Sequence, residues 1–588
     1  MTNDRQQEAK RIRESSSQLA FERPHPIHQS NGDEERLANL NFAMSFTKGL
    51  QHSSGTGLIE NAGDFKAFRA AIDKGFVDDF TTSVPSAPRK QRAWEAPTAG
   101  LVYDLQGPDS QAVTMAPAPA LGSKELAYEM AEVYELALLR EVPLSEFNHA
   151  SGNPELASST SRLNEVDYDV TGTEGRSRKN ETGNVTAQTA FRGSSPGVEV
   201  GPYLSQLMLL GNVGVATDRD VLDGLVSYGP HEISQKVPVA LPNVDFMTEW
   251  SDWLDVQNGV DTQGGQQTQL FGPPPVDRRF ITTPRDLATY VHYDALYQAY
   301  LNACLILLGM GTPTDPGFDN LSGRGSLFLN SLSPESAALT RNWETHEREA
   351  GGFALWGGPH VLTLVTEVAT RALKAVRYQK FNVHCRLRPE ALAGRIEKAA
   401  QIESDYPVIG RGFLDLENEI QPTVDAIKAH NASDTKLLPM AFQEGSPMHP
   451  AYGAGHATVA GACVTMLKAF FDTSAVLVKR GSAITFATYQ PGDIAVAYVP
   501  DATGNTLSDV SDGTYLTLEA ELNKLAANIS IGRNMAGVHY YSDYFDSVRM
   551  GEAIAIGMLE EQALCYPTDK FVLSVPTFDG EVRRIGRR

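Results

Sequence analysis

The sequence predicts a large globular protein that is rich in α-helix. Its 588 residues are 41% hydrophobic and 21% charged, which is typical of a chain that folds around a sizeable core. In several segments apolar residues recur every three or four positions, as they do along the buried face of an amphipathic helix. Length alone would also allow several domains, so one large helical domain is an expectation that the periodicity favours.

The composition excludes several classes of partner. A net charge of −22 argues against a nucleic acid or an anionic membrane, because both favour a basic surface. An anionic ligand would therefore need a local positive pocket. The chain has no run of roughly 18 apolar residues and begins with MTNDRQQEAK, which lacks the apolar core of a secretory signal. We expect a soluble protein and leave its compartment open.

The spacing of the cysteines predicts neither a metal site nor a disulfide framework. The four cysteines are far apart in the sequence and form no CxxC pair: Cys304, Cys385, Cys463 and Cys565. Neither a zinc site nor a dense set of disulfides is predicted.

The N-terminal part of the chain predicts fewer features. Residues 1–36 are polar and charged, and we expect a flexible arm that makes contacts in an oligomer. Residues 37–357 are expected to form a helical half with long loops. Within it, helical periodicity covers 127–139 and 284–310, whereas 148–200 predicts a surface excursion and 264–275 a connector.

The C-terminal half, 358–588, contains three segments with candidate functional residues. The first is a predicted helix whose apolar stripe ends on Lys380; the stripe comprises Val361, Val365, Val368, Ala372 and Val376. A lysine in that position either reaches water or points into a buried anion site. Arg388 precedes Pro389, which predicts a helix exit there. Each cation alone is more often a solvated surface residue, and His384 between them is expected to be structural.

The second segment is a tight turn at 452–455 that begins an apolar helix. His456 falls in the first turn of this helix, where unpaired amides and the helix dipole favour an oxyanion. His449, followed by Pro450, lies seven residues earlier. Either histidine taken alone could be a hydrogen-bonded core residue.

The third segment repeats the pattern of the first. A stripe of Leu518, Leu522, Leu525 and Ile529 leads to Arg533. Gly537 can break this helix, and Ser542 with Asp543 can cap a new one that ends near Ala563. Asp543 follows His539 by four residues, so it can hold one nitrogen of that ring. It can equally be a plain carboxylate at a helix start, and both roles are compatible.

Taken together, these segments resemble a known family. Lys380-x7-Arg388-Pro389, Gly455-His456 and Arg533-x5-His539-x3-Asp543 resemble the anion-site signature of vanadium-dependent haloperoxidases and the acid phosphatases related to them. The seven-residue gap before Arg388, and the phrases GHATVAG and RNMAGVHY, are similar to the algal and cyanobacterial vanadium bromoperoxidases. The resemblance covers most of the chain and is densest at 350–566.

The resemblance implies a mainly α fold built on two four-helix bundles and a large homo-oligomer, often a dodecamer. It implies vanadate bonded to His539 Nε2. Its oxygens would be hydrogen-bonded by Lys380, Arg388, Arg533 and the Gly455 amide, with His456 at the axial oxygen. His449 would be the acid–base residue, and Lys380 would also polarise the bound peroxide. Calcium occurs in similar assemblies, but no loop here has convincing ligand spacing.

The implied activity is oxidation of bromide and iodide by hydrogen peroxide, with chloride left open, to hypohalous acid that halogenates organic acceptors. One residue departs from the family, because Ala454 stands where a serine is usual. Losing one charge-assisted hydrogen bond costs roughly 1.5–3 kcal/mol, so weaker vanadate retention or slower turnover is expected. Two alternatives remain: an acid phosphatase with His539 as nucleophile, and a vanadate-binding oligomer with weakened activity.

Overall fold

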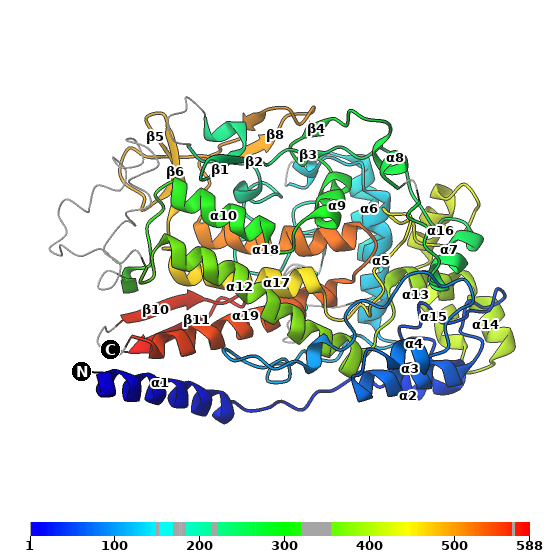
Figure 1. Ribbon diagram of the computed structural model, residues 1–588. Coiled ribbons are helices and arrows are strands. Elements are labelled where there is room, and N and C mark those ends of the chain that lie inside the picture. Colours follow the sequence, from blue (N-terminus) through cyan, green and yellow to red (C-terminus); the bar gives the residue numbers. More distant parts are fainter. Residues whose placement is uncertain are drawn as a thin grey trace.

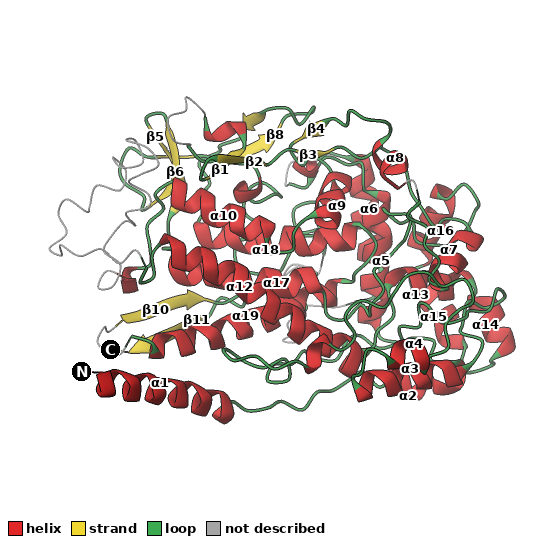
Figure 2. Cartoon of the chain, viewed as in Figure 1, coloured by secondary structure: helices red, strands yellow, loops and turns green. Residues whose placement is uncertain are grey.

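The computed structural model describes residues 2–148, 152–168, 176, 178, 184–213, 220–264, 266–318, 354–566 and 571–587. Over these residues the chain is mainly helical, and short strands lie at the periphery (Figures 1 and 2). The predicted fold class is confirmed.

A central group of helices surrounds α17 (Gly455–Phe470). α17 packs against α12 (Gly358–Tyr378), α18 (Leu518–Met535) and α19 (Tyr541–Leu564), while α9 (Pro284–Tyr293) and α10 (Gln298–Gly309) cover the outside (Figure 1). All residues of α17 from Ala457 onward are buried. This burial on every side explains why α17 is apolar around its whole circumference.

Glycines allow α17 and α19 to approach each other closely. A Cβ atom added to Gly461 would lie 2.0 Å from the Val548 carbonyl oxygen, and one added to Gly551 would lie 2.1 Å from that of Thr458. The two backbones are therefore in direct contact, with no side chain between them at these positions.

A second group of helices lies beside the first (Figure 1). α5 (Lys124–Leu138) contacts α6 (Pro154–Glu165), α16 (Gln421–His430) and also α18. α13 (Pro389–Glu397), α14 (Ala399–Asp405) and α15 (Arg411–Glu419) complete the group. Buried Glu135 of α5 pairs with Arg162 at 2.7 Å and accepts a hydrogen bond from Thr423 at 2.7 Å, which links α5 to α6 and α16.

The remaining helices are short or peripheral. They are α2 (Asp33–Arg36), α3 (Ala62–Lys74), α4 (Asp79–Thr82), α7 (Trp250–Gln257) and α8 (Gln266–Phe271), with single 3-10 turns at Ala38–Leu40, Ala99–Leu101, Leu144–Glu146, Gln206–Met208, Val221–Asp223 and Pro316–Phe318.

The described strands pair only in antiparallel ladders. β1 (Leu225–Tyr228) pairs with β2 (His231–Ser234), β3 (Val237–Pro238) with β4 (Arg278–Arg279), β8 (Tyr498–Pro500) with β9 (Leu507–Asp509), and β10 (Phe571–Pro576) with β11 (Val582–Arg587). β5 (Val476–Arg480) pairs with both β6 (Ala483–Ala487) and β7 (Ile494–Ala495). These strands flank the helices and do not enter the central group (Figure 2).

The N-terminal segment differs from the expected flexible arm, because residues Thr2–Glu22 form helix α1. The polar residues that suggested disorder are Glu, Gln, Lys and Arg, which are also strong helix formers. A Lys10–Glu14 pair at 2.7 Å supports the helix, and Arg23 contacts Glu561 of α19 at 2.6 Å. The predicted role of this segment in oligomer contacts stays a prediction.

The other predicted helices and loops agree only in part with the structure. The helices expected at 127–139 and 361–380 are α5 and α12, whereas 284–310 forms two helices separated at Asp294. The region 148–200 contains helix α6, and its residues 149–151, 169–175, 177 and 179–183 lie outside the described part. The connector at 264–275 contains α8. The divisions after residues 36 and 357 stay predictions.

No helix among the described residues combines the length and the apolar character that a membrane crossing requires.

We predict that the free energy of unfolding falls as pH decreases from 6.5 to 3. Burial lowers the pKa of His52, His292 and His384 to about 3 in the folded chain. Over this range the unfolded chain binds protons at these rings and the folded chain does not, so each ring contributes up to about 1.4 kcal/mol per pH unit.

Urea unfolding at pH 6 and pH 4 measures this difference. His52 is 1% exposed and bonded to Thr47 and to the Leu50 carbonyl. In His52→Gln the loss of stability between the two pH values should be smaller by about 2 kcal/mol. An equal pH dependence in variant and wild type would contradict the assignment.

Candidate active site

Lys380 and Arg388 lie where α12 meets the second group of helices. α12 continues as one π-helical turn, Gln379–His384, which contains Lys380. Arg388 is the N-cap of α13, with φ −83° and ψ 158°. The predicted helix exit at Arg388 is therefore wrong: the extended residue precedes a helix that has Pro389 in its first turn. His384 is buried beside Gln379 at 3.2 Å, as a structural residue would be.

Lys380 is fully buried. Its Nζ donates to the carbonyl oxygens of Pro450 at 2.7 Å and Ala451 at 3.0 Å. Burial lowers the pKa of Lys380 well below its ordinary value, and Arg388 and Arg377 act in the same direction. The ammonium group holds the turn before α17 and keeps one further N–H for another acceptor.

Arg388 connects two of the predicted histidines. Its Nη1 donates to His539 Nε2 at 2.9 Å and to the Val538 carbonyl at 2.7 Å. Its Nη2 donates to His449 Nδ1 at 2.7 Å, and its Nε donates to the His449 carbonyl at 2.9 Å. Burial lowers the pKa of Arg388 to about 9.

The His539 ring is held in one tautomer. Its Nδ1 lies 2.7 Å from Asp543 Oδ2, and its Nε2 accepts from Arg388. Since a guanidinium can only donate, Nδ1 carries the hydrogen and Nε2 presents its lone pair, as a metal ligand must. Burial lowers the pKa of His539 well below its ordinary value, with Arg388 and Lys380 adding to the effect.

Asp543 faces the His539 ring and also lies at the start of a helix, so the two positions considered for it occur together. It lies in the first turn of α19 and accepts a hydrogen bond from the Tyr540 amide at 3.1 Å, while the same oxygen faces His539. Its other oxygen accepts from Arg386 at 3.2 Å. The carboxylate is 0% exposed, and burial raises the pKa of Asp543.

The backbone at the start of α17 is loosely packed at Gly455. Ala454 is its N-cap, makes no side-chain capping bond, and donates its amide to Ser547 at 2.8 Å. A Cβ atom added to Gly455 would meet only Leu373, at 3.8 Å. His456 Nε2 lies 2.9 Å from Asp294 Oδ1, at the end of α9. This contact leaves Nδ1 of His456 for a different group.

Arg533 lies in the last turn of α18, as predicted. Its Nη1 donates to the Val291 carbonyl at 2.8 Å, and its buried Nε has no hydrogen-bond partner among the described residues. Burial lowers the pKa of Arg533. Lys380, Arg388 and Arg533 all act electrostatically on His539. These buried cations, with the start of α17, provide the donor set of an oxyanion site.

His449 lies at the edge of this group. Its Nε2 is 3.6 Å from Glu95 Oε2, while Nδ1 is held by Arg388. Burial lowers the pKa of His449 well below its ordinary value, together with the nearby Arg377 and Lys380. The ring is therefore neutral at neutral pH.

The sequence predicted no role for three residues near this site, Asp294, Glu95 and Arg377. Asp294 and Glu95 come from distant segments with no motif around them. Arg377, whose buried Nη1 has no hydrogen-bond partner in the described part of the chain, precedes Lys380 by three residues on α12. That spacing was a usable signal, because residues three apart lie on one helix face.

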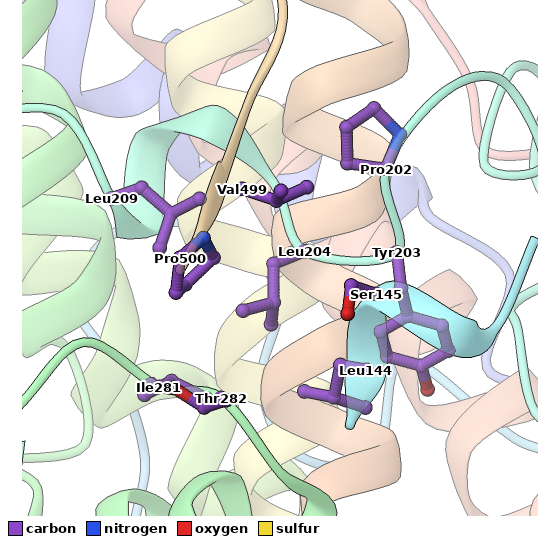
Figure 3. Close-up of a pocket in the computed structure, with 10 residues that line it drawn as sticks. All are labelled: Leu144, Ser145, Pro202, Tyr203, Leu204, Leu209, Ile281, Thr282, Val499 and Pro500. Carbon is purple, nitrogen blue, oxygen red and sulfur yellow. The ribbon is translucent and has the colours of Figure 1, made fainter. Parts of the chain in front are cut away.

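A separate cavity behind Tyr203 is a poor candidate for the site (Figure 3). It is lined mainly by apolar side chains, including Leu144, Leu204 and Val499, and its volume is about 20 Å3. Such a space holds about one water molecule. Among the described residues, no group of three or more His, Cys, Asp or Glu could hold a metal cation.

Comparison with known proteins identifies the family. A vanadium-dependent bromoperoxidase from Corallina officinalis is 40% identical over 97% of both chains. The chain belongs to the vanadium-dependent bromoperoxidase family. The enzyme of the same name from Corallina pilulifera is 41% identical over 97% of both chains, and that of Ascophyllum nodosum is 29% identical over 99% of this chain and 93% of its own.

Fold comparison agrees with this bromoperoxidase family. The family model "VCPO second helical-bundle domain" matches residues 425–564, which contain α17, α18 and α19. The homohexameric structure of the second vanadate-dependent bromoperoxidase from Ascophyllum nodosum aligns with a TM-score of 0.73 at 24% identity, over 99% of this chain and 90% of that one. At this identity the match concerns the fold alone.

We predict that Asp543→Asn weakens vanadate binding by about 10- to 100-fold, because an amide supports the His539 ring less strongly than a carboxylate does. Equilibrium dialysis of the apoprotein measures the dissociation constant. Asp546→Asn is the matched control: it lies on the same helix and is nearly as buried, but it contacts Tyr452 and Arg176. Equal weakening in both variants would show that the effect is not specific to His539.

Proposed function

We propose that this bromoperoxidase-family chain binds vanadate and oxidises bromide with hydrogen peroxide to hypobromous acid. The observation that carries the proposal is the His539 ring, which is neutral, oriented by Asp543, and turned with its Nε2 lone pair toward Arg388. Family membership at 40% identity over nearly the whole chain supports the same activity.

The described residues fit a bound vanadate. His539 Nε2 would bond the vanadium, and Lys380, Arg388, Arg533 and the Gly455 amide would donate to its oxygens. Several fixed donors are needed because a multiply charged oxyanion is costly to bury without them. Two observations agree: Arg533 Nε has no partner within the described residues, and Lys380 keeps one N–H. When bound, vanadate supplies a Lewis acid that activates peroxide.

The protein residues would then position and move protons. His456 is held by Asp294 through Nε2, so its Nδ1 would contact an oxygen of the vanadate. Arg388 would exchange its contact with His539 for one with an oxygen of the anion. His449, whose Nδ1 is on the side of Arg388, would take up or release the peroxide proton at that atom. Lys380 would donate its remaining N–H to an oxygen in the pocket and withdraw electron density from it.

Substrates and assembly are proposed from the same relatives. We propose bromide and iodide as the halides, with chloride open, and organic acceptors that react with the released hypohalous acid. A homo-oligomer is proposed because the Ascophyllum nodosum structure is described as a homohexamer; the twelve-subunit assembly stays a prediction. A structural calcium ion stays a prediction, because calcium also binds backbone and amide carbonyl oxygens.

The two alternative functions have no better support. An acid phosphatase would use the same donors with His539 as nucleophile, but the relatives above are named bromoperoxidases. A vanadate-binding oligomer with weakened activity depends on Ala454 alone.

We expect bromide oxidation by peroxide to rise in proportion to vanadate occupancy when the apoprotein is titrated. Hydrolysis of a phosphate ester should stay near background in the same protein. His539→Ala should lose vanadate binding and at least about 100-fold in rate, since the metal then has no protein ligand. His231→Ala, on the exposed strand β2, is the control. Phosphate-ester hydrolysis that exceeds bromide oxidation would reject the proposal in favour of a phosphatase.

We predict that Ala454→Ser raises vanadate affinity by roughly 10- to 150-fold, the equivalent of one charge-assisted hydrogen bond. The new hydroxyl could instead cap α17, because Ala454 has the extended backbone of an N-cap, with φ −89° and ψ 125°. Capping would stabilise the apoprotein by about 0.5–2 kcal/mol. Vanadate affinity, turnover rate and the melting temperature of the apoprotein separate these effects. Unchanged affinity and rate would reject the role for this position.

A further inference from the structure

Bromide oxidation by peroxide consumes a proton. The role inferred below for a residue that supplies this proton rests on the function proposed above. The balanced reaction is Br⁻ + H2O2 + H⁺ → HOBr + H2O: bromide is oxidised, peroxide is reduced, and the O–O bond breaks as the O–Br bond forms. Each turnover therefore draws one proton from bulk water into a pocket whose donors are buried. Lys380, Arg388, Arg533 and His539 are each at most 5% exposed.

The His449 ring can exchange a proton at two separate atoms. Arg388 donates to Nδ1 at 2.7 Å, so Nδ1 is an acceptor and Nε2 carries the hydrogen of the neutral ring. The Pro450 carbonyl is also 3.2 Å from Nδ1, but a guanidinium can only donate, and its contact is the shorter one. Nδ1 thus belongs to the anion pocket, and Nε2 points out of it.

Glu95 lies on the outward side of this ring. Its Oε2 is 3.6 Å from Nε2 of His449, a separation that a small side-chain movement or one water molecule closes. The Glu95 side chain is 42% exposed, whereas that of His449 is 10% exposed. The carboxylate therefore lies between a buried imidazole and solvent.

The position of Glu95 is fixed by the segment that carries His449. The Glu95 amide donates to the Met448 carbonyl at 3.0 Å, and the Met448 amide donates to Glu95 Oε1 at 3.1 Å. This leaves Oε2 for the histidine. Arg92 and Arg377 flank the carboxylate at 3.9 and 4.0 Å.

Besides the Pro450 carbonyl, the other groups that act on His449 are cations. Arg377, Lys380 and Arg388 each favour its neutral form. A guanidinium cannot accept a proton from an imidazolium, and Lys380 is already bonded to two carbonyl oxygens. Among the described groups around this ring, Glu95 is the one that combines a proton acceptor with access to water.

We propose that Glu95 is a positioning residue that acts through His449, orienting its ring and exchanging the Nε2 proton with solvent. Once Arg388 Nη2 turns from Nδ1 to the anion, Nδ1 can take a proton from the pocket, and the ring gives its Nε2 proton to the Glu95 carboxylate. In the opposite direction the protonated carboxyl returns a proton to Nε2 as Nδ1 releases one to the pocket.

Glu95→Gln tests this role, because it keeps the shape of the side chain and removes the exchangeable proton. We expect vanadate affinity within about twofold of wild type and the KM for bromide within about threefold, with kcat at least about tenfold lower. Formate or acetate added to the assay should restore much of kcat in this variant and should leave the wild type unaffected. Glu60→Gln, at an exposed position away from the site, is the matched control.

A second measurement does not depend on activity. Exchange of the imidazole C2 hydrogen with deuterium, followed by mass spectrometry on the apoprotein, reports the pKa of His449. Removing the facing carboxylate in Glu95→Gln should lower that pKa by about 0.5 or more.

The outcomes separate the two proposals. Unchanged kcat, a loss of kcat that neither acid restores, or weakened vanadate binding in Glu95→Gln would overturn the role of Glu95. A wild-type protein without vanadate-dependent bromide oxidation would reject the proposed function. If the wild type lacks this activity, the pKa of His449 still tests the contact between Glu95 and His449. An unaltered pKa in Glu95→Gln would overturn that contact, and a lowered pKa would support it.

Discussion

The site depends on one buried guanidinium. Arg388 donates to the rings of His539 and His449 and to the backbone carbonyls of Val538 and His449. It therefore fixes the relative positions of two loops that are 90 residues apart in the sequence. Its charge is costly to bury, as the lowering of its pKa to about 9 indicates. Such a group is stable when its donors are satisfied, and an oxyanion would satisfy them further. The apoprotein is thus organised around a cation that favours an anionic ligand.

Helix ends place the charged groups around Arg388. Lys380 follows α12 in a π-helical turn, Arg388 begins α13, Arg533 ends α18, and Gly455 begins α17. Each group belongs to a helix whose apolar face is buried, so the packing of the bundle determines where its end lies. The position of the donors is therefore a property of the core.

Much of this arrangement could be predicted from the sequence, because helix periodicity and residue spacing are local properties. The apolar stripes that lead to Lys380 and Arg533 located two of the cations, and the turn before Gly455 located a helix start. Asp294 and Glu95 could not be predicted in this way, since each contacts its histidine across more than 100 residues of chain. Arg388 was placed at the wrong end of a helix because a residue before proline suits a helix start as well as a helix exit. Helix α1 was missed because composition alone does not separate a solvated helix from a disordered arm.

The glycines at the contact of α17 and α19 have a wider consequence. α17 begins at Gly455, whose amide belongs to the proposed anion site, and α19 follows directly after His539. Because the two backbones touch at Gly461 and Gly551, the spacing between the His539 ring and the start of α17 is set deep inside the protein. Changes in the surface loops would then leave the dimensions of the proposed anion pocket unaltered.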